Sequence, residues 1–93
     1  MYYVYMMTNA SNSVLYVGMT NDLRRRAAEH RTHRNPDSFT AKYKSHKLVW
    51  FEQTKSVFSA ITREKQIKDW SRKKKLELIL DVNPTFTDLF PTL

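Results

Sequence analysis

The chain has 93 residues, of which 41% are hydrophobic and 27% charged, so we expect residues 1–93 to form a single domain around one core. It has no cysteine and a single glycine, which excludes disulfides, cysteine-based zinc sites and glycine-rich phosphate loops. With a formal net charge of +7, the protein as a whole is basic at pH 7. The first seven residues carry no basic leader and no apolar run long enough to cross a bilayer, so we expect a cytoplasmic protein with no membrane partner.

The positive charge is concentrated in the middle of the chain. All sixteen Lys and Arg residues lie between Arg24 and Lys75, a span that holds only five of the nine acidic residues. Such segregation suits a surface that faces a polyanion, because neutralised phosphates release condensed counterions. The alternative is a solvated basic face without a partner. An anionic membrane is less favoured, since no basic amphipathic segment carries a strong apolar face.

The N-terminal half predicts two strands and a helix. Residues 1–7 and 14–18 are rich in Tyr and Val, and the polar connector 8–13 suits a hairpin. Gly18, the lone glycine, marks a place where a side chain would collide or where φ is unusual. A helix is expected over about 22–31, capped by the polar residues 20–22.

The C-terminal half predicts one more strand and two helices. Residues 48–53 form an apolar, aromatic strand, and helices follow over 57–70, after a Ser56 cap, and from Ser71 to the stop at Asn83. The apolar tail residues then pack onto the core. The order β-β-α-β-α-α predicts an α+β fold, with a small three-stranded, mostly antiparallel sheet flanked by helices.

Periodicity brings several reactive side chains together. Tyr3 and Tyr5 share one face of the first strand, and Arg26 and His30 lie one turn apart on the first helix. Glu64 falls inside the apolar stripe of the second helix, where a carboxylate is costly unless a positive group meets it. We therefore expect Glu64 to point into the pocket formed by the phenols and the guanidinium.

These residues resemble the GIY-YIG nuclease superfamily. Residues 3–5 and 16–18 resemble its paired signature, while Arg26, His30 and Glu64 match its helix-one Arg and His and its helix-two metal-binding Glu. The resemblance covers nearly the whole chain.

The likeness is greatest to the small stand-alone branch of that superfamily. The segments 39–43 and 63–70 are typical of this branch, and Asn83 corresponds to the family's late asparagine. Tyr3 replaces the first glycine of the signature and Val17 replaces an isoleucine. The branch tolerates both substitutions.

The resemblance implies hydrolysis of a DNA phosphodiester at a single Mg²⁺ or Mn²⁺ ion held by Glu64. One carboxylate suffices as protein ligand, because Mg²⁺ keeps several waters and uses substrate phosphate oxygens. Arg26 would stabilise charge on the phosphate, Tyr5 would act as general base, Tyr16 would orient the water or phosphate, and His30 would assist. Asn83 joins this catalytic set.

DNA, with RNA as an alternative, is the expected partner. The basic residues expected to hold its backbone are Arg24, Arg25, Arg31, Lys42, Lys44, Arg63, Lys68, Arg72, Lys73, Lys74 and Lys75, with Trp50 or Trp70 stacking on bases. Two alternatives remain open. One is a nucleic-acid-binding module that keeps the fold but does not cut, and the other is a structural protein with an incidental basic face.

Overall fold

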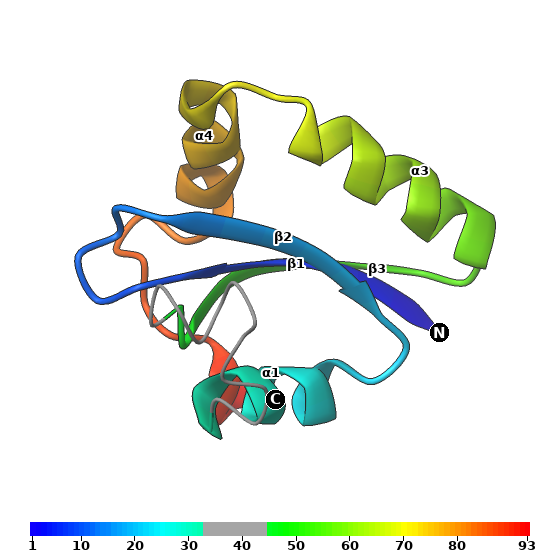
Figure 1. Ribbon diagram of the computed structural model, residues 1–93, viewed down its shortest axis with the longest axis horizontal. Coiled ribbons are helices and arrows are strands. Elements are labelled where there is room, and N and C mark those ends of the chain that lie inside the picture. The colour runs from blue at the N-terminus through cyan, green and yellow to red at the C-terminus, as the bar shows by residue number, and fades with distance from the viewer. Residues whose placement is uncertain (33–44) are drawn as a thin grey trace.

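The computed structural model describes residues 1–32 and 45–93, so the predicted segment 39–43 and the predicted DNA contacts Lys42 and Lys44 lie outside the described residues. The expected α+β fold and element order are confirmed (Figure 1). The elements are β1 (Tyr2–Thr8), β2 (Leu15–Thr20), α1 (Leu23–Thr32), β3 (Lys47–Thr54), α3 (Val57–Lys68), α4 (Arg72–Val82) and the short 3₁₀ turn η1 (Phe90–Thr92).

The three strands form an antiparallel sheet in the order β2-β1-β3, so β1 is the central strand of the described sheet. Alternate side chains of β1 point to opposite faces. Val4 and Met6 pack in one apolar cluster with residues of α3 and α4, while Tyr5 and Met7 pack in a second cluster with Leu23 of α1. Figure 1 shows the same division, with α1 on one face of the sheet and α3 and α4 on the other.

A bulge in β3 alters this alternation. Met6 pairs with Trp50 and Met7 with Leu48, so Val49 is the extra residue on β3. Val49 and Trp50 consequently both join the cluster beneath α3 and α4. Trp50 is only 4% exposed, so the prediction that it stacks on nucleic-acid bases is wrong.

Local sequence signals explain where the helices begin. The side chains of Ser56 and Ser71 accept hydrogen bonds from the backbone N–H groups of Ser59 and Lys74, as expected of N-cap residues. Asp22 caps α1 in the same way, with its carboxylate accepting from the N–H of Arg25. These caps satisfy orphan donors in the first turn of each helix.

The chain passes from the α4 face of the sheet to the α1 face through the segment that follows Asn83. Phe86 packs against the cluster under α3 and α4, whereas Leu89 and Leu93 pack against the cluster under α1. The tail is therefore part of the core, as expected. On α4, Ile79 is fully buried whereas the next residue, Leu80, is 46% exposed.

Across the described parts of the chain, no helix has the length and apolar character needed to cross a membrane.

Candidate active site

Tyr5 is the centre of the polar cluster on the α1 face of the sheet. It lies on the central strand and is 1% exposed, with its phenolic oxygen 2.9 Å from Nε2 of His30. His30 is also buried and reaches the sheet from the last turn of α1. Buried polar groups need hydrogen-bond partners, and this bond satisfies one group of each residue.

Tyr16 completes a group of three rings from three elements. Its ring centroid lies 6.2 Å from that of Tyr5 and 5.4 Å from that of His30, and the Tyr5 and His30 centroids are 5.8 Å apart. The tilted arrangement is within the range of favourable aromatic contacts. The expected meeting of two phenols and an imidazole is therefore present in the structure.

Gly18 makes room for these phenols. It pairs with Tyr5 across β1 and β2, and a Cβ atom at this position would lie 2.5 Å from Cζ and the hydroxyl oxygen of Tyr5 and 2.9 Å from Cε2 of Tyr16. Its φ is not positive. Of the two explanations that the sequence left open, collision is the correct one. The sequence pointed to this position because Gly18 is its single glycine. It could not predict which side chains a Cβ atom there would meet.

Arg26 adds a guanidinium to the cluster. It forms a 3.4 Å ion pair with Glu29 and keeps 42% of its side chain exposed. Burial by itself lowers the pKa of Arg26, but contacts with Tyr5, Glu29 and Tyr16 outweigh burial and raise it. The cation is therefore permanent, and it faces both the phenols and solvent.

Burial raises the pKa of the Tyr5 phenol, and the nearby Tyr16 raises it further. The positive charge of Arg26 opposes this shift without cancelling it. Tyr5 is therefore a neutral phenol over the ordinary pH range, able both to donate a hydrogen bond and to accept one.

Glu64 lies on the other side of the sheet, because α3 covers the face opposite α1 (Figure 1). Its side chain is 22% exposed and forms a 3.3 Å ion pair with Lys68, one turn further along α3. Ala60 and Ile67 on the same stripe are fully buried. Because α3 packs against the edge strand β2 and the central strand β1 almost equally, the sheet lies between this helix and the phenols. A pocket shared by Glu64 and the phenols stays a prediction.

Asn83 serves the backbone at the C-terminal end of α4. Its buried amide nitrogen donates to the carbonyls of Val49 and Thr87, at 3.0 and 2.9 Å, and its amide oxygen accepts from the N–H of Thr87 at 3.0 Å. These three bonds fasten the tail to β3. They give Asn83 a structural role, and the catalytic role expected of it stays a prediction.

Two of the predicted DNA contacts are engaged with the C-terminal tail. Arg24 donates to the carbonyl of Leu93, and Arg31 pairs with the carboxylate of Asp88. Both guanidinium groups also lie over the ring of Phe90, at 5.9 and 4.7 Å from its centroid. Asp88, which also accepts from the N–H of Leu48, was not singled out from the sequence. A phosphate would have to compete with these internal contacts.

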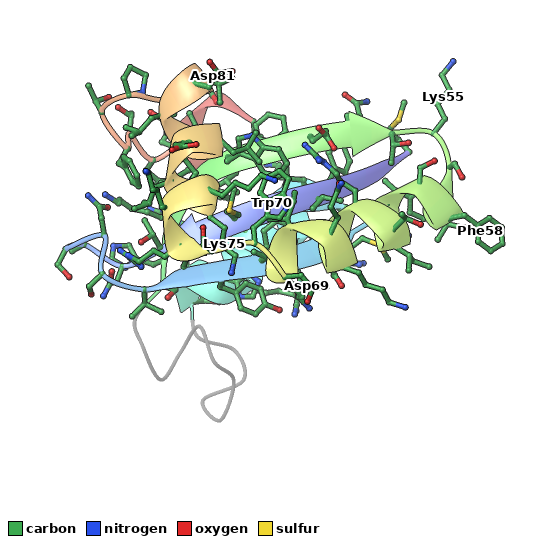
Figure 2. All side chains as sticks on the ribbon, turned by 90° about the horizontal axis from the view of Figure 1, so that it is seen from above. Lys55, Phe58, Asp69, Trp70, Lys75 and Asp81 are labelled. Atoms are coloured by element: carbon green, nitrogen blue, oxygen red, sulfur yellow. The ribbon has the colours of Figure 1, made fainter. Side chains whose placement is uncertain are left out.

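Three more of the predicted contacts, on α3 and α4, also have internal partners. Arg63 and Lys74 sit 5.2 and 4.4 Å from the Trp70 ring centroid, and Arg72 donates to the carbonyls of Asn12 and Ser13. Figure 2 shows Trp70 at the junction of the two helices. Trp70 is half-buried and has two cations against its ring, so a stacked base would have to compete with them.

Other predicted contacts are less constrained. The side chains of Arg25, Lys73 and Lys75 have no hydrogen bond or ion pair with another described residue. Within residues 1–32 and 45–93, no three acidic or histidine side chains gather closely enough to hold a metal ion. Any ion at Glu64 would therefore need water and substrate oxygens as its other ligands.

Comparison with known families identifies the chain's relationship. A family model described as the GIY-YIG catalytic domain matches residues 1–77, which include β1, β2, α1, β3, α3 and half of α4. The match contains Tyr5, Tyr16, Arg26, His30 and Glu64.

Two curated relatives and one solved structure agree with this match. The chain is 36% identical to a UPF0213 protein of Syntrophus aciditrophicus over 77 residues, covering 83% of this chain and 87% of the relative. It is 34% identical to a UPF0213 protein of Limosilactobacillus reuteri over 82 residues, covering 86% and 83%. The solution NMR structure of the UPF0213 protein BH0048 from Bacillus halodurans has a TM-score of 0.59 and 26% identity, covering 94% of this chain and 90% of the other.

Proposed function

The chain belongs to the GIY-YIG catalytic domain family, and on that premise we propose that it is a metal-dependent endonuclease that hydrolyses DNA phosphodiester bonds. The family is a nuclease family, and its members generally use divalent metals, so a nucleic-acid substrate follows from membership. The observation that carries the proposal is the buried Tyr5–His30 hydrogen bond, with Tyr16 and the cation of Arg26 beside it.

In this proposal Tyr5 and His30 act together as the general base. Because burial raises the pKa of Tyr5, a standing phenolate is scarce at neutral pH. The Tyr5 hydroxyl instead donates to Nε2 of His30 and accepts a hydrogen bond from the attacking water. The water proton passes to Tyr5 as the phenolic proton passes to His30, so the water oxygen bonds to phosphorus and the imidazole becomes imidazolium.

Arg26 and Tyr16 act on the phosphate. A guanidinium matches the geometry of phosphate oxygens and stabilises the charge that develops as the P–O bond to the leaving group breaks. Arg26 is suited to this because it is permanently charged and still 42% exposed. Tyr16, whose ring lies beside both Tyr5 and His30, would orient the water or a phosphate oxygen.

Glu64 would hold the metal, with Mg²⁺ as the first candidate and Mn²⁺ as the second. Its carboxylate is partly exposed, and its ion pair with Lys68 is of the weak surface type, so it is available to a hard cation. A divalent ion bound there together with a substrate phosphate would supply positive charge to the reacting group.

The wider proposal concerns how the protein meets its substrate. The exposed cations Arg25 and Lys73 and the half-buried Lys75 supply salt-dependent contacts to the DNA backbone, and RNA is the alternative polyanion. Residues 1–93 would act as one domain, and the absence of cysteine fits a cytoplasmic location.

The test compares Glu64→Gln with the wild type in a plasmid-nicking assay with Mg²⁺ or Mn²⁺. We expect Glu64→Gln to lose metal-dependent cleavage and to keep its DNA affinity, because the change removes a charge and little volume. Glu77→Gln, at an exposed position of α4, is the matched control and should cleave normally. Unchanged nicking by Glu64→Gln would exclude the mechanism. DNA binding without cleavage by the wild type would favour a non-catalytic binding module.

A second pair of variants separates catalysis from charge. Arg26→Ala should lower the cleavage rate by about 10²–10³-fold at saturating DNA, because it removes charge stabilisation at the phosphate. Arg25→Ala removes the same charge from the next residue and should weaken DNA binding with little change in that rate. Equal effects of the two variants on the rate would contradict the role of Arg26.

A further inference from the structure

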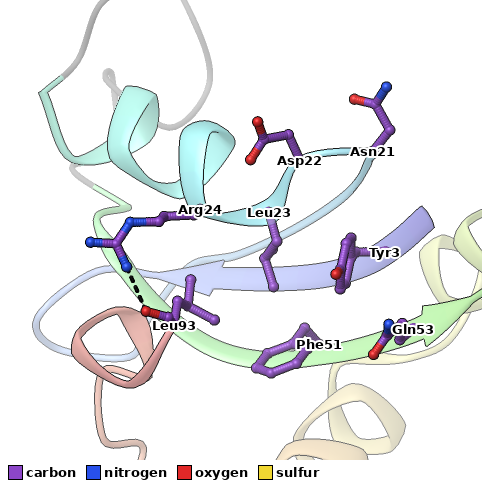
Figure 3. Close-up of a pocket in the computed structure, with 8 residues that line it drawn as sticks. All are labelled: Tyr3, Asn21, Asp22, Leu23, Arg24, Phe51, Gln53 and Leu93. Carbon is purple, nitrogen blue, oxygen red and sulfur yellow. Dashed lines mark hydrogen bonds between the residues drawn. The ribbon is translucent and has the colours of Figure 1, made fainter. Parts of the chain in front are cut away.

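A pocket of about 330 Å³ lies at the N-terminal end of α1, on the same face of the sheet as Tyr5 but separate from it. Leu23 points from α1 toward the sheet, and Tyr3 and Phe51 face it from β1 and β3 (Figure 3). The volume is at the lower end of the range for small-molecule sites, so it suits one planar ring system better than an extended ligand.

The interior of this pocket is aromatic and apolar. The rings of Tyr3 and Phe51 are in edge contact, with centroids 6.5 Å apart, and Leu23 is buried beneath them. Phe51 is 36% exposed, which is high for a phenylalanine on a strand that otherwise contributes to the core. An exposed aromatic face next to a buried aliphatic floor is the kind of surface on which a flat base stacks.

The rim of the pocket carries hydrogen-bonding groups. Gln53 contributes a side-chain amide with two donors and an acceptor, and the exposed Asn21 lines the rim with its amide turned away from Leu23 (Figure 3). Gln53 pairs with Tyr3 across β1 and β3, so the two side chains lie on the same face of the sheet. Arg24 places a positive charge at the mouth. Apolar walls with a few polar groups at the rim are typical of ligand sites.

We propose that this pocket binds one unpaired nucleobase of the nucleic-acid substrate, which stacks on Phe51 and Tyr3 and pairs through its edge with the amide of Gln53. The inference rests on the proposed function, since it names the part of the substrate that lies next to the bond to be cut. An amide side chain can bind a base edge with a donor and an acceptor at once.

The position of the pocket ties it to the reacting groups. Tyr3 and Tyr5 are two residues apart on one face of β1, about 7 Å along the strand. Leu23, the floor of the pocket, belongs to the same apolar cluster as Tyr5. A base held here therefore fixes a nucleotide close to the scissile phosphate. The substrate favoured by this arrangement has an unpaired or unstacked base, because a base inside a duplex cannot enter a pocket.

The first experiment measures base-dependent affinity without metal, so that it is independent of cleavage. A short single strand with one 2-aminopurine should lose fluorescence on binding the wild type, because the base stacks on an aromatic ring. Phe51→Ala should weaken binding about 10-fold or more and abolish the quenching. Phe58→Ala, which removes a 77% exposed ring from α3, is the matched control and should behave as wild type (Figure 2).

An abasic strand of the same length distinguishes stacking from a damaged surface. Wild type and Phe51→Ala should bind the abasic strand equally. If Phe51→Ala weakens both strands alike, the pocket does not read a base and the inference fails. Cleavage by the wild type without base-dependent quenching would overturn the inference and leave the proposed function standing, whereas quenching without cleavage would do the reverse.

The second experiment uses a free nucleoside, which has no phosphate to attract the basic surface. Titration of the ¹⁵N-labelled protein with adenosine should shift the side-chain amide signal of Gln53. The signal of Gln66 is the control, because its amide oxygen accepts from Arg63 in a separate groove on α3. Shifts at Gln66 alone, or at neither amide, would exclude a base-binding pocket at the start of α1.

Discussion

The two faces of the sheet carry different kinds of side chain. The face under α3 and α4 is apolar, with Val4, Met6 and Val17 packed against Ala60 and Ile67. The face under α1 instead carries buried polar groups among its apolar ones, with phenols, an imidazole and a guanidinium. Apolar burial is non-directional, whereas buried polar groups require fixed partners.

This difference assigns a separate task to each face. The α3/α4 face supplies stability, because each of its side chains is removed from water without the need for a polar partner. The α1 face holds Tyr5 and His30 in one geometry, and that geometry is what a general base requires. Substitutions of buried side chains on only one face should therefore separate stability from catalysis.

Asn83→Ala should have the largest effect on stability, because Asn83 joins the two faces. Its amide binds the backbone of Val49 on β3 and of Thr87 in the tail. Loss of these buried bonds should lower the free energy of unfolding by about 2–4 kcal/mol. The cleavage rate per folded molecule should change little well below the melting temperature. A loss of rate without a loss of stability in urea unfolding would instead support the catalytic role that the sequence predicts for Asn83.

Gly18→Ala should have the next largest effect on stability, and it acts on the face of the sheet under α1. The added methyl would lie 2.5 Å from the phenol of Tyr5, so strand or ring must move, at a cost of about 1–3 kcal/mol. Cleavage should fall as well, because Tyr5 is displaced from His30. A double-mutant cycle with Tyr5→Leu should show favourable coupling, since leucine lacks the atoms that collide. Additive effects in thermal unfolding would show that the clash is not with Tyr5.

Alkaline pH should lower the free energy of unfolding, and Tyr5→Phe should remove the part of this effect that comes from the Tyr5 phenol. Burial raises the pKa of Tyr5 above its unfolded value of about 10. Between the two values the folded chain holds a proton that the unfolded chain releases, so stability is complete below pH ~10 and falls as pH rises. The slope from one such group reaches about 1.4 kcal/mol per pH unit. Denaturant titrations above pH ~10 should show a shallower fall for Tyr5→Phe, and equal slopes would contradict the shift.

Much of the fold was predictable because its signals are local. The cap residues Ser56 and Ser71 mark where two helices begin, and Asn83 marks where the second of them ends. The alternation of side chains in residues 2–8 divides the central strand between two faces. The meeting of Tyr5 and His30 was predictable as well, because strand and helix periods together place them on one side, whereas Tyr16 was expected beside them from the family resemblance.

Other features depend on contacts that no local pattern contains. The bulge at Val49 turns Trp50 into the core, so composition alone suggested a stacking residue that the structure buries. Arg24 and Arg31 looked like free cations, yet they bind residues of the C-terminal tail that lie 69 and 57 positions further along the chain. The helical period put Glu64 on the inner stripe of α3 correctly, but it could not tell which face of the sheet α3 would cover.

Lys68→Ala should have the smallest effect, and it refines the comparison of the two faces at Glu64. Lys68 is 51% exposed, so its 3.3 Å pair with Glu64 is a surface contact worth about 0.3–0.5 kcal/mol, and unfolding should barely change. If Glu64 binds the metal, removal of the competing ammonium should lower the metal concentration for half-maximal cleavage about twofold. Lys65→Ala, on an exposed part of the same helix, controls for the lost charge. A higher metal requirement in Lys68→Ala alone would mean that Lys68 positions the Glu64 carboxylate for the metal, and that the pair is a working part of the site on the otherwise apolar face.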